Sequence, residues 1–321
     1  MNTVSLIPSR ELEQLFSRIE HLSKFVESLS NEVNSLKVAN EQLREENEKI
    51  PSKIAEEDAL KKVRYCVSEL NRDDFNEDDL DDYCDRLTQI EEIMVIETPY
   101  IRNFSNMFID CDIVDTDVLC DWDVSKGTNF KGMFLRCDYL DDLVGIGYWD
   151  VSNGTDFSHM FEFCKVLIDL SSLSNWDISN GTNFSYMFYA CGSLSSLEGL
   201  ERWDVSKGTN FSWMFSRCCN LEDLTALSNW NVSNGTDFSH MFEFCKFLID
   251  LSSLSNWDVS NGTNFDNMFS DCPIEDIKLL VNWCIPKEYD VKDMFTDFDD
   301  NLPKNISEEQ IEWLNKNIKR H

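Results

Sequence analysis

The sequence predicts an α/β repeat solenoid, with one short strand and one short helix in each 27-residue repeat, preceded by a long N-terminal α-helical coiled coil. Tryptophans recur every 27 residues from Trp122 to Trp257, and a Met-Phe pair begins eleven residues after each one. Leucines at heptad spacing near the N-terminus predict the coiled coil. Because every repeat carries the same residue types, whereas catalysis needs different groups that converge on one point, this pattern favours binding or scaffolding.

Residues 9–50 are expected to form a parallel coiled coil. The d position of the heptads holds leucines and a final isoleucine, and the a position holds Leu12, Ile19, Val26, Val33, Asn40 and Asn47. Leucine at d with β-branched residues at several a positions favours a two-stranded coil, so we expect a homodimer. The expected dimer contacts are Leu15, Leu22, Leu29, Leu36, Asn40 and Leu43. The alternatives are a heterodimer and a single amphipathic helix that folds back on the repeats.

Both ends of the array are expected to be covered by helices, because a terminal repeat exposes an apolar face. Residues 51–95 are acidic and predict a helical N-terminal cap. Residues 303–321 predict a C-terminal capping helix, since Ser307 and Gln310 have the spacing of a capping box. The eight repeats then span residues 96–302.

The repeat at 176–202 illustrates the expected elements. Trp176 and Ile178 alternate with polar residues, which predicts a strand. Asn180-Gly181 predicts a turn, after which Thr182 could cap a short helix. Phe184, Met187, Phe188 and Cys191 have the i, i+3, i+4, i+7 spacing of a buried helical stripe. Because helices need more room than strands, we expect a curved array with helices on its convex side.

The pattern Trp-Asp-Val-Ser, Phe-x-x-Met-Phe-x-x-Cys and Leu-x-x-Leu resembles the BspA-like leucine-rich repeats, bacterial surface protein repeats that also occur in protists and large DNA viruses. The terminal repeats depart from it: Ile96 replaces Trp, Val291 replaces Phe, and Phe298 replaces Cys. The resemblance implies a right-handed solenoid and a role in protein binding or adhesion.

The composition of the chain excludes some classes of partner and predicts a location. A formal net charge of −32 argues against nucleic-acid binding and against attraction to anionic lipid. Basic partners remain possible, although excess acid also serves solubility. The absence of a signal peptide and of a membrane-length apolar run predicts a cytoplasmic or intracellular protein without membrane insertion, or a virion component if the source is viral. Seven of the twelve cysteines occupy one repeat position, which favours buried, reduced thiols.

A helical wheel places aromatic residues on the outer side of the expected helices. We expect them to form a convex strip that docks an unidentified protein, unless a cap, the coiled coil or another chain covers it. The candidate binding residues are His159, Phe163, Tyr186, Tyr189, Trp213, His240 and Phe244.

No catalytic, cofactor or metal site is expected. The aspartates that follow the tryptophans lack the carboxylate count of a calcium loop, and turn-stabilising bonds explain them better. His159 and His240 are separated by three repeats, too far apart for a metal pair, and no nucleophile or phosphate-loop motif accompanies them. The sequence therefore predicts a non-enzymatic, dimeric protein-binding scaffold with a curved acidic surface. The alternatives are a structural, surface or virion component that assembles through its repeats and, less favoured, an enzyme.

Overall fold

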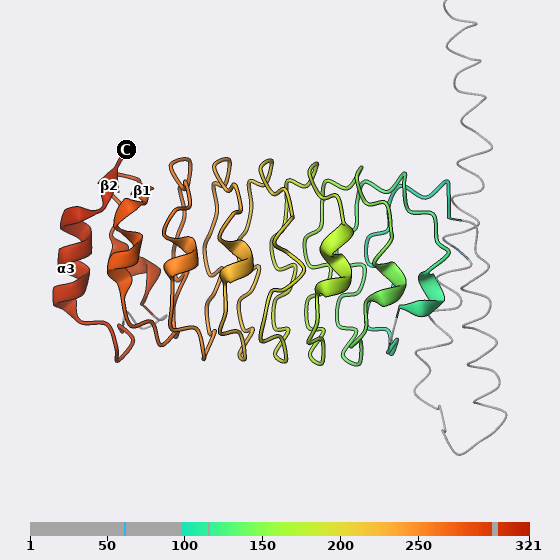
Figure 1. Cartoon of the computed structure of the whole chain (residues 1–321), viewed down its shortest axis with the longest axis horizontal. Helices are drawn as coiled ribbons and strands as arrows, with labels where there is room; N and C mark the ends of the chain where they lie inside the picture. Colours follow the sequence, from blue (N-terminus) through green and yellow to red (C-terminus); the bar gives the residue numbers. More distant parts are fainter. Residues whose placement is uncertain (1–60, 62–97, 115, 297–300) are drawn as a thin grey trace, which may run out of the picture. The chain divides into compact units, whose positions relative to one another are not determined.

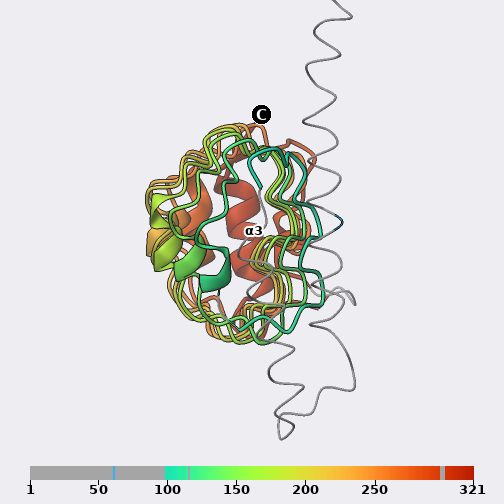
Figure 2. The same cartoon turned by 90° about the vertical axis from the view of Figure 1, so that its right-hand side faces the viewer.

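The computed structural model describes Lys61 and residues 98–114, 116–296 and 301–321. The expected coiled coil and its dimer contacts therefore lie outside the described residues, as does almost all of the expected N-terminal cap. Within the described part, successive 27-residue coils lie side by side (Figure 1). Seen along the array, equivalent parts of the coils lie one behind another (Figure 2).

Regular secondary structure in the coils is sparse. The elements in chain order are the 3₁₀ turns η1 (Asp117–Leu119), η2 (Val144–Ile146), η3 (Ser171–Asn175), η4 (Thr225–Leu227), η5 (Ser252–Leu254) and η6 (Ile277–Asn282), then β1 (Cys284–Ile285), η7 (Val291–Met294), α3 (Glu308–Asn317) and β2 (Lys319–Arg320). Strands β1 and β2 pair in parallel, with Cys284 opposite Lys319. From η1 to η6 the 3₁₀ turns lie in the segment that leads to the next tryptophan.

Backbone hydrogen bonds between neighbouring coils hold the array together. In the coil that begins at Trp176, four alternate residues donate their N–H groups to the next coil: Phe184 to Asn210, Tyr186 to Ser212, Phe188 to Met214 and Ala190 to Ser216, at 2.8–3.0 Å between N and O. An isolated parallel bridge joins Asn183 to Asn210, and the same bridge recurs from Asn103 to Asn264.

The short helix expected over Phe184–Cys191 does not form. Tyr186 and Ala190 have φ values of 59° and 58°, which interrupt a right-handed helix. Their N–H groups bond the next coil instead of the carbonyl four residues back. The inward residues are nevertheless buried as the pattern predicted, since Phe184, Met187 and Cys191 are all 0% exposed. The stripe identified the core positions, but not the backbone that presents them.

Two further local expectations differ from the structure. Trp176 and Ile178 are buried but belong to no strand. Thr182 caps no helix; its N–H and hydroxyl both bond the carbonyl oxygen of Thr155 in the preceding coil, at 2.9 and 3.1 Å.

The expected curvature is also absent, since the coils in Figures 1 and 2 follow one another in a nearly straight row. The coils contain 3₁₀ turns in place of α-helices, so neither side of the array is forced wider.

Aromatic ladders fill the core. From Trp149 to Trp283, the indole Nε1–H of each repeat tryptophan donates to a carbonyl of the preceding coil, as Trp203 does to Leu173 at 3.0 Å. Two phenylalanines per coil stack on their counterparts in the next; Phe188, for example, lies between Phe161 and Phe215, at ring-centroid distances of 5.6 and 5.7 Å. Such repeated contacts make each coil depend on its neighbours.

Helix α3 packs against η6 and η7 at the C-terminal end of the array. Ser307 is its N-cap and forms the expected capping box with Gln310. Ile311 and Leu314 are buried against the last coil. The helix thus covers apolar side chains that a further coil would otherwise cover.

Candidate binding surface

In seven successive coils, from Asn106 and Asp110 to Asn267 and Asp271, two residues project outward from a left-handed backbone conformation. The first position precedes the Met-Phe pair, and the second lies four residues later. From Asn106 to Asn267, the residues at both positions donate a backbone hydrogen bond to the next coil. Because the coils are in register, side chains at one position form a column that runs along the array. The residue types at one position of successive coils therefore determine the chemistry of one strip of the surface.

The first column contains a continuous stack of four rings, which we call the ring stack: His159, Tyr186, Trp213 and His240. Its centroid distances are 4.7 Å from His159 to Tyr186, 5.4 Å from Tyr186 to Trp213 and 3.8 Å from Trp213 to His240, with interplanar angles of 8–13°. The rings are half-buried. The stack is therefore a preformed surface that spans four coils.

Two other candidate residues join the ring stack. Tyr189 packs against Tyr186 and Trp213 at 5.4 and 5.8 Å, and Phe163 meets Tyr189 edge-on at 5.3 Å. Burial, with a smaller effect of the nearby Glu162 carboxylate, raises the pKa of the Tyr186 hydroxyl. Six of the seven predicted residues thus form one cluster.

Phe244, the seventh predicted residue, lies beneath two cations. The Arg217 guanidinium lies 4.6 Å from the centroid of its ring, and the Lys246 ammonium lies 4.4 Å from it. Both distances fall within the range of cation–π attraction. Sequence reasoning missed these two basic residues, although their spacing from Phe244 repeats that of Arg136, Phe163 and Lys165, each 81 residues earlier.

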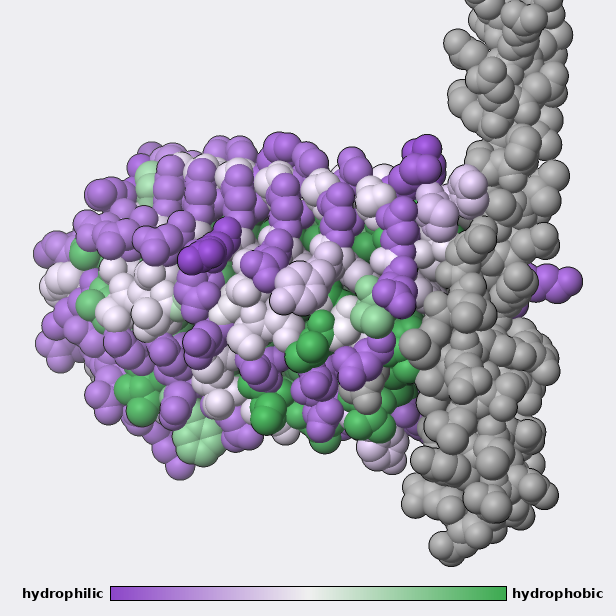
Figure 3. Space-filling model, turned by 45° about the vertical axis from the view of Figure 1, so that its right-hand side comes forward, coloured by the Kyte–Doolittle hydropathy of each residue, from purple (hydrophilic) through white to green (hydrophobic). Residues whose placement is uncertain are grey.

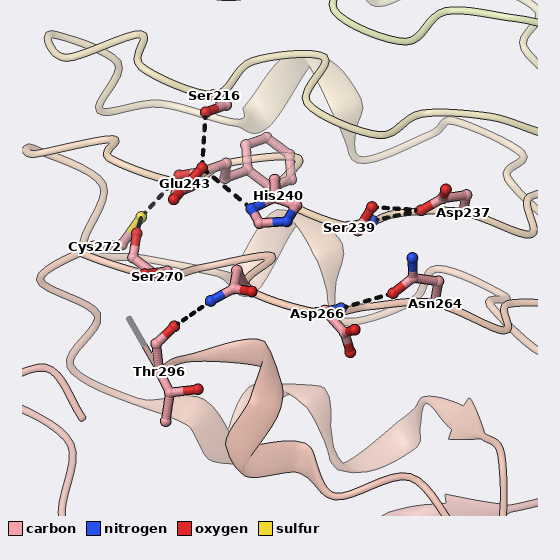
Figure 4. A network of polar contacts seen from close by, with 12 residues as sticks. Ser216, Asp237, Ser239, His240, Glu243, Asn264, Asp266, Ser270, Cys272 and Thr296 are labelled. Atoms are coloured by element: carbon pink, nitrogen blue, oxygen red, sulfur yellow. Dashed lines mark hydrogen bonds and ion pairs between the residues drawn. The ribbon is translucent and has the colours of Figure 1, made fainter. Parts of the chain in front are cut away.

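Beneath the end of the ring stack lies a buried carboxylate that the sequence did not reveal. Glu243 is 0% exposed, and its Oε2 accepts from Ser216 Oγ at 3.4 Å and lies 3.2 Å from His240 Nδ1 (Figure 4). Glu243 Oε1 and Ser270 Oγ are buried without a hydrogen-bond partner. Burying a carboxylate is costly unless it is paired, so the contact with His240 stabilises Glu243 and orients the imidazole. His159 and Glu162 make the same contact at the other end of the stack.

The aspartates after the tryptophans stabilise turns, as expected. Asp177 Oδ1 accepts the backbone N–H of Ser179 at 3.0 Å, and Asn231 does the same for Ser233 at 3.1 Å. Hydrogen bonds from the side chain and then the backbone of Ser179 lower the pKa of Asp177. Because an amide serves equally well at position 231, the carboxylate charge is not essential to the turn.

The repeated cysteines are buried core residues. Cys191 Sγ donates to the Phe161 carbonyl oxygen at 3.1 Å, and burial raises the pKa of its thiol. The cysteines of the described residues are free thiols. The column is buried as expected, and the raised pKa disfavours the nucleophilic thiolate there.

Exposed apolar side chains were also missed. Val166 and Ile168 in one coil, and Phe247 and Ile249 three coils later, are 40–60% exposed. In the view of Figure 3 the surface is largely polar, with apolar side chains gathered in patches on its lower part.

The described part of the chain holds no cluster of three or more His, Cys, Asp or Glu residues suited to a metal ion. Among the same residues, no helix is long and apolar enough to cross a membrane.

Comparison with known families gives one match. The sequence model of a family described as "Mycoplasma protein of unknown function, DUF285" matches residues 79–197 and 193–308, as two tandem copies. No curated protein and no solved structure matches the chain significantly.

Proposed function

The chain belongs to the family described as Mycoplasma protein of unknown function, DUF285, and we propose that it is a non-enzymatic scaffold that binds another protein through its repeat array. The observation that carries this proposal is the ring stack. Four aromatic or imidazole rings from four successive coils form a half-buried surface at positions where other coils carry Asn106, Gly132 and Asn267. Rigid aromatic surfaces are typical of binding hot spots.

We further propose that the array is a BspA-like leucine-rich-repeat solenoid. BspA-like repeat proteins carry DUF285, which supports this assignment. The 27-residue period, the buried Met-Phe-x-x-Cys segment and the leucines at every third residue also support it. In this proposal each coil is a spacer unit, and the outward positions of a few coils provide the recognition.

The proposed scaffold is a homodimer joined through residues 9–50. Two arrays in one particle would present two copies of the ring stack, and a partner with repeated sites would then bind with increased avidity. The support for this step is the leucine and asparagine heptad pattern of the sequence.

Assembly of arrays with one another is the second candidate function. The exposed Val166, Ile168, Phe247 and Ile249 favour it, because exposed apolar patches also form contacts between identical chains. In that case the full chain would form particles larger than a dimer, with a size that rises with concentration.

The proposed function is tested by crosslinked capture from source-cell lysate with the full chain. Tyr186→Ala/Trp213→Ala removes the centre of the ring stack, and we expect it to lose a specific protein that the wild-type chain captures. Truncating such an anchor commonly weakens binding by about 2 kcal/mol or more, roughly thirtyfold.

The matched control is Tyr100→Ala/Tyr148→Ala, which removes two exposed aromatic rings outside the ring stack. This control should capture the same protein as the wild type. Equal capture by the ring-stack variant would remove the ring stack as the docking surface, and concentration-dependent assembly without capture would favour the second candidate.

A further inference from the structure

The chain contains two copies of an Arg-Phe-Lys cluster, related by a shift of 81 residues. The first consists of Arg136, Phe163 and Lys165; the second consists of Arg217, Phe244 and Lys246. In each, the arginine lies over the phenylalanine ring of the next coil, at 5.7 Å in the first cluster and 4.6 Å in the second. The two clusters therefore allow a comparison within one molecule.

The chain itself supplies carboxylates to the first cluster. Arg136 pairs with Asp110 at 3.7 Å and Lys165 pairs with Asp138 at 2.6 Å, and in both pairs the acid comes from the preceding coil. Both cations of this cluster thus have an acidic partner.

The second cluster lacks both of these acids. Ala190 occupies the left-handed position that corresponds to Asp110, and Cys219 occupies the position that corresponds to Asp138. Arg217 is exposed and has no acidic partner among the described residues, while Lys246 lies 3.7 Å from Asp271 in the following coil. A chain of net charge −32 thus leaves two adjacent cations with one carboxylate between them.

The preceding coil leaves room next to Arg217. Its residues Ala190 and Gly192 are small, and a Cβ added at Gly192 would have no neighbour within 4 Å. Ala190 lies between Phe163 and Arg217 in the second column, next to Tyr189 of the aromatic cluster. A side chain from outside can therefore approach Arg217 from the same direction as Asp110 approaches Arg136.

We propose that the Arg217–Phe244–Lys246 cluster binds aspartate or glutamate side chains of the protein that docks on the ring stack. This inference rests on the proposed function and names the chemistry of the partner: an acidic segment that also carries an aromatic or aliphatic residue. The partner's carboxylates take the places of Asp110 and Asp138. The planar guanidinium favours carboxylates, and the ring beneath it holds it in position.

The test uses the full chain with ¹⁵N-labelled arginine and follows the Nε–Hε signals by NMR. Substitution by lysine at positions 136 and 217 assigns the two signals. The probe is a capped peptide of alternating glutamate and glycine with one phenylalanine, and its control carries glutamine in place of glutamate. The acidic peptide should shift the Arg217 signal and not that of Arg136, and the control peptide should shift neither.

Two variants test the role of the acidic partner, one by adding it beside Arg217 and the other by removing it beside Arg136. Ala190→Asp supplies the missing acid and should weaken peptide binding at Arg217 about fivefold, the upper range for one exposed ion pair. Aspartate is tolerated there because Asp110 has the same left-handed conformation, with φ of 54°. Asp110→Ala should make the Arg136 signal respond to the peptide. Equal responses of the two arginines in the wild type, or no effect of Ala190→Asp, would overturn the proposal.

Two other ligands of the Arg217–Phe244–Lys246 cluster, inorganic phosphate and a second copy of the chain, would give different results. Stronger binding of inorganic phosphate than of the peptide would show that the cluster binds phosphate rather than carboxylate. Self-association of the chain that is lost in Ala190→Asp would show that the cluster binds a second copy of the chain rather than another protein. Either result overturns the proposal. A lysate partner whose capture does not change in Ala190→Asp would remove this inference and leave the proposed function standing. If Arg217 responds to the peptide but no partner is captured, the cluster remains a carboxylate-binding site and the proposed function is removed.

Discussion

At the scale of single residues, left-handed backbone conformations shape the outer surface of the array. Residues other than glycine adopt them at both outward positions, with φ between 54° and 62°. Each such residue costs about 1 kcal/mol or more. A hydrogen bond to the next coil, with a net value of about 1 kcal/mol, offsets much of that cost. The side chain at each position is consequently free to vary, because the backbone bond does not depend on it.

At position 132 a side chain would combine two costs, a left-handed backbone and a close approach to the Asn106 side chain. Gly132 has φ of 59°, and an added Cβ would lie 2.3 Å from Asn106 Oδ1. Gly132→Ala should therefore lower the free energy of unfolding by about 1–2 kcal/mol, measured by chemical denaturation of the full chain.

Gly192→Ala is the control for that prediction. Gly192 does not have a positive φ, and its added Cβ would meet nothing within 4 Å. The free energy of unfolding should stay the same or rise by up to about 1 kcal/mol, because alanine restricts the unfolded chain. Equal destabilisation by both substitutions would contradict the steric explanation.

At the scale of elements, hydrogen bonds between coils replace those within helices and strands. From η1 to η6, each 3₁₀ turn has three to six residues. The coil at 176–202 has none and bends instead at Gly199, whose φ is 105°. Helix α3 differs, because it lies at the end of the array and satisfies its own backbone groups. Its N-terminus depends on Ser307, whose Oγ accepts from the Gln310 N–H at 3.3 Å.

Ser307→Ala should destabilise α3 by about 1 kcal/mol, whereas Ser307→Asp should retain the cap. Because contacts in an array run between neighbours, amide hydrogen exchange should increase around Trp283 and stay unchanged around Trp149. Uniformly faster exchange along the array would show instead that the coils unfold as one cooperative unit.

At the scale of the molecule, the acidic charge opposes the dimerisation that we propose. A net charge of −32 per chain repels a second chain, so a homodimer requires a specific seam. The heptad leucines of residues 9–50 provide the candidate seam, and the asparagines at Asn40 and Asn47 would set its register.

Leu22→Asp/Leu29→Asp should convert the chain to a monomer, because charges at two d positions cannot be buried in the seam. Light scattering coupled to size-exclusion chromatography should report half of the wild-type mass. Glu27→Gln/Glu41→Gln lies outside the a and d positions and should keep the dimer. A wild-type chain that is already monomeric would instead favour the single folded-back helix.

The sequence by itself determined which residues of each coil are buried. Trp176, Phe184, Met187 and Cys191 were placed inward from their spacing alone, and all are at most 4% exposed. The aspartate turns and the Ser307 capping box were also predictable, because both depend on partners two or three residues away in the chain. The seven candidate binding residues were placed on the outer side by a helical wheel, although the helix that the wheel assumed does not form.

Only the tertiary structure decided how the backbone reaches those positions and which outward residues meet. A helix at Phe184–Cys191 was excluded by hydrogen bonds to a coil 26 residues away, which no local pattern contains. The Arg217 guanidinium over Phe244 and the burial of Glu243 also depend on neighbouring coils. The physical reason is that local spacing sets which face of the chain a side chain occupies, whereas its neighbours on that face come from the stacking of coils.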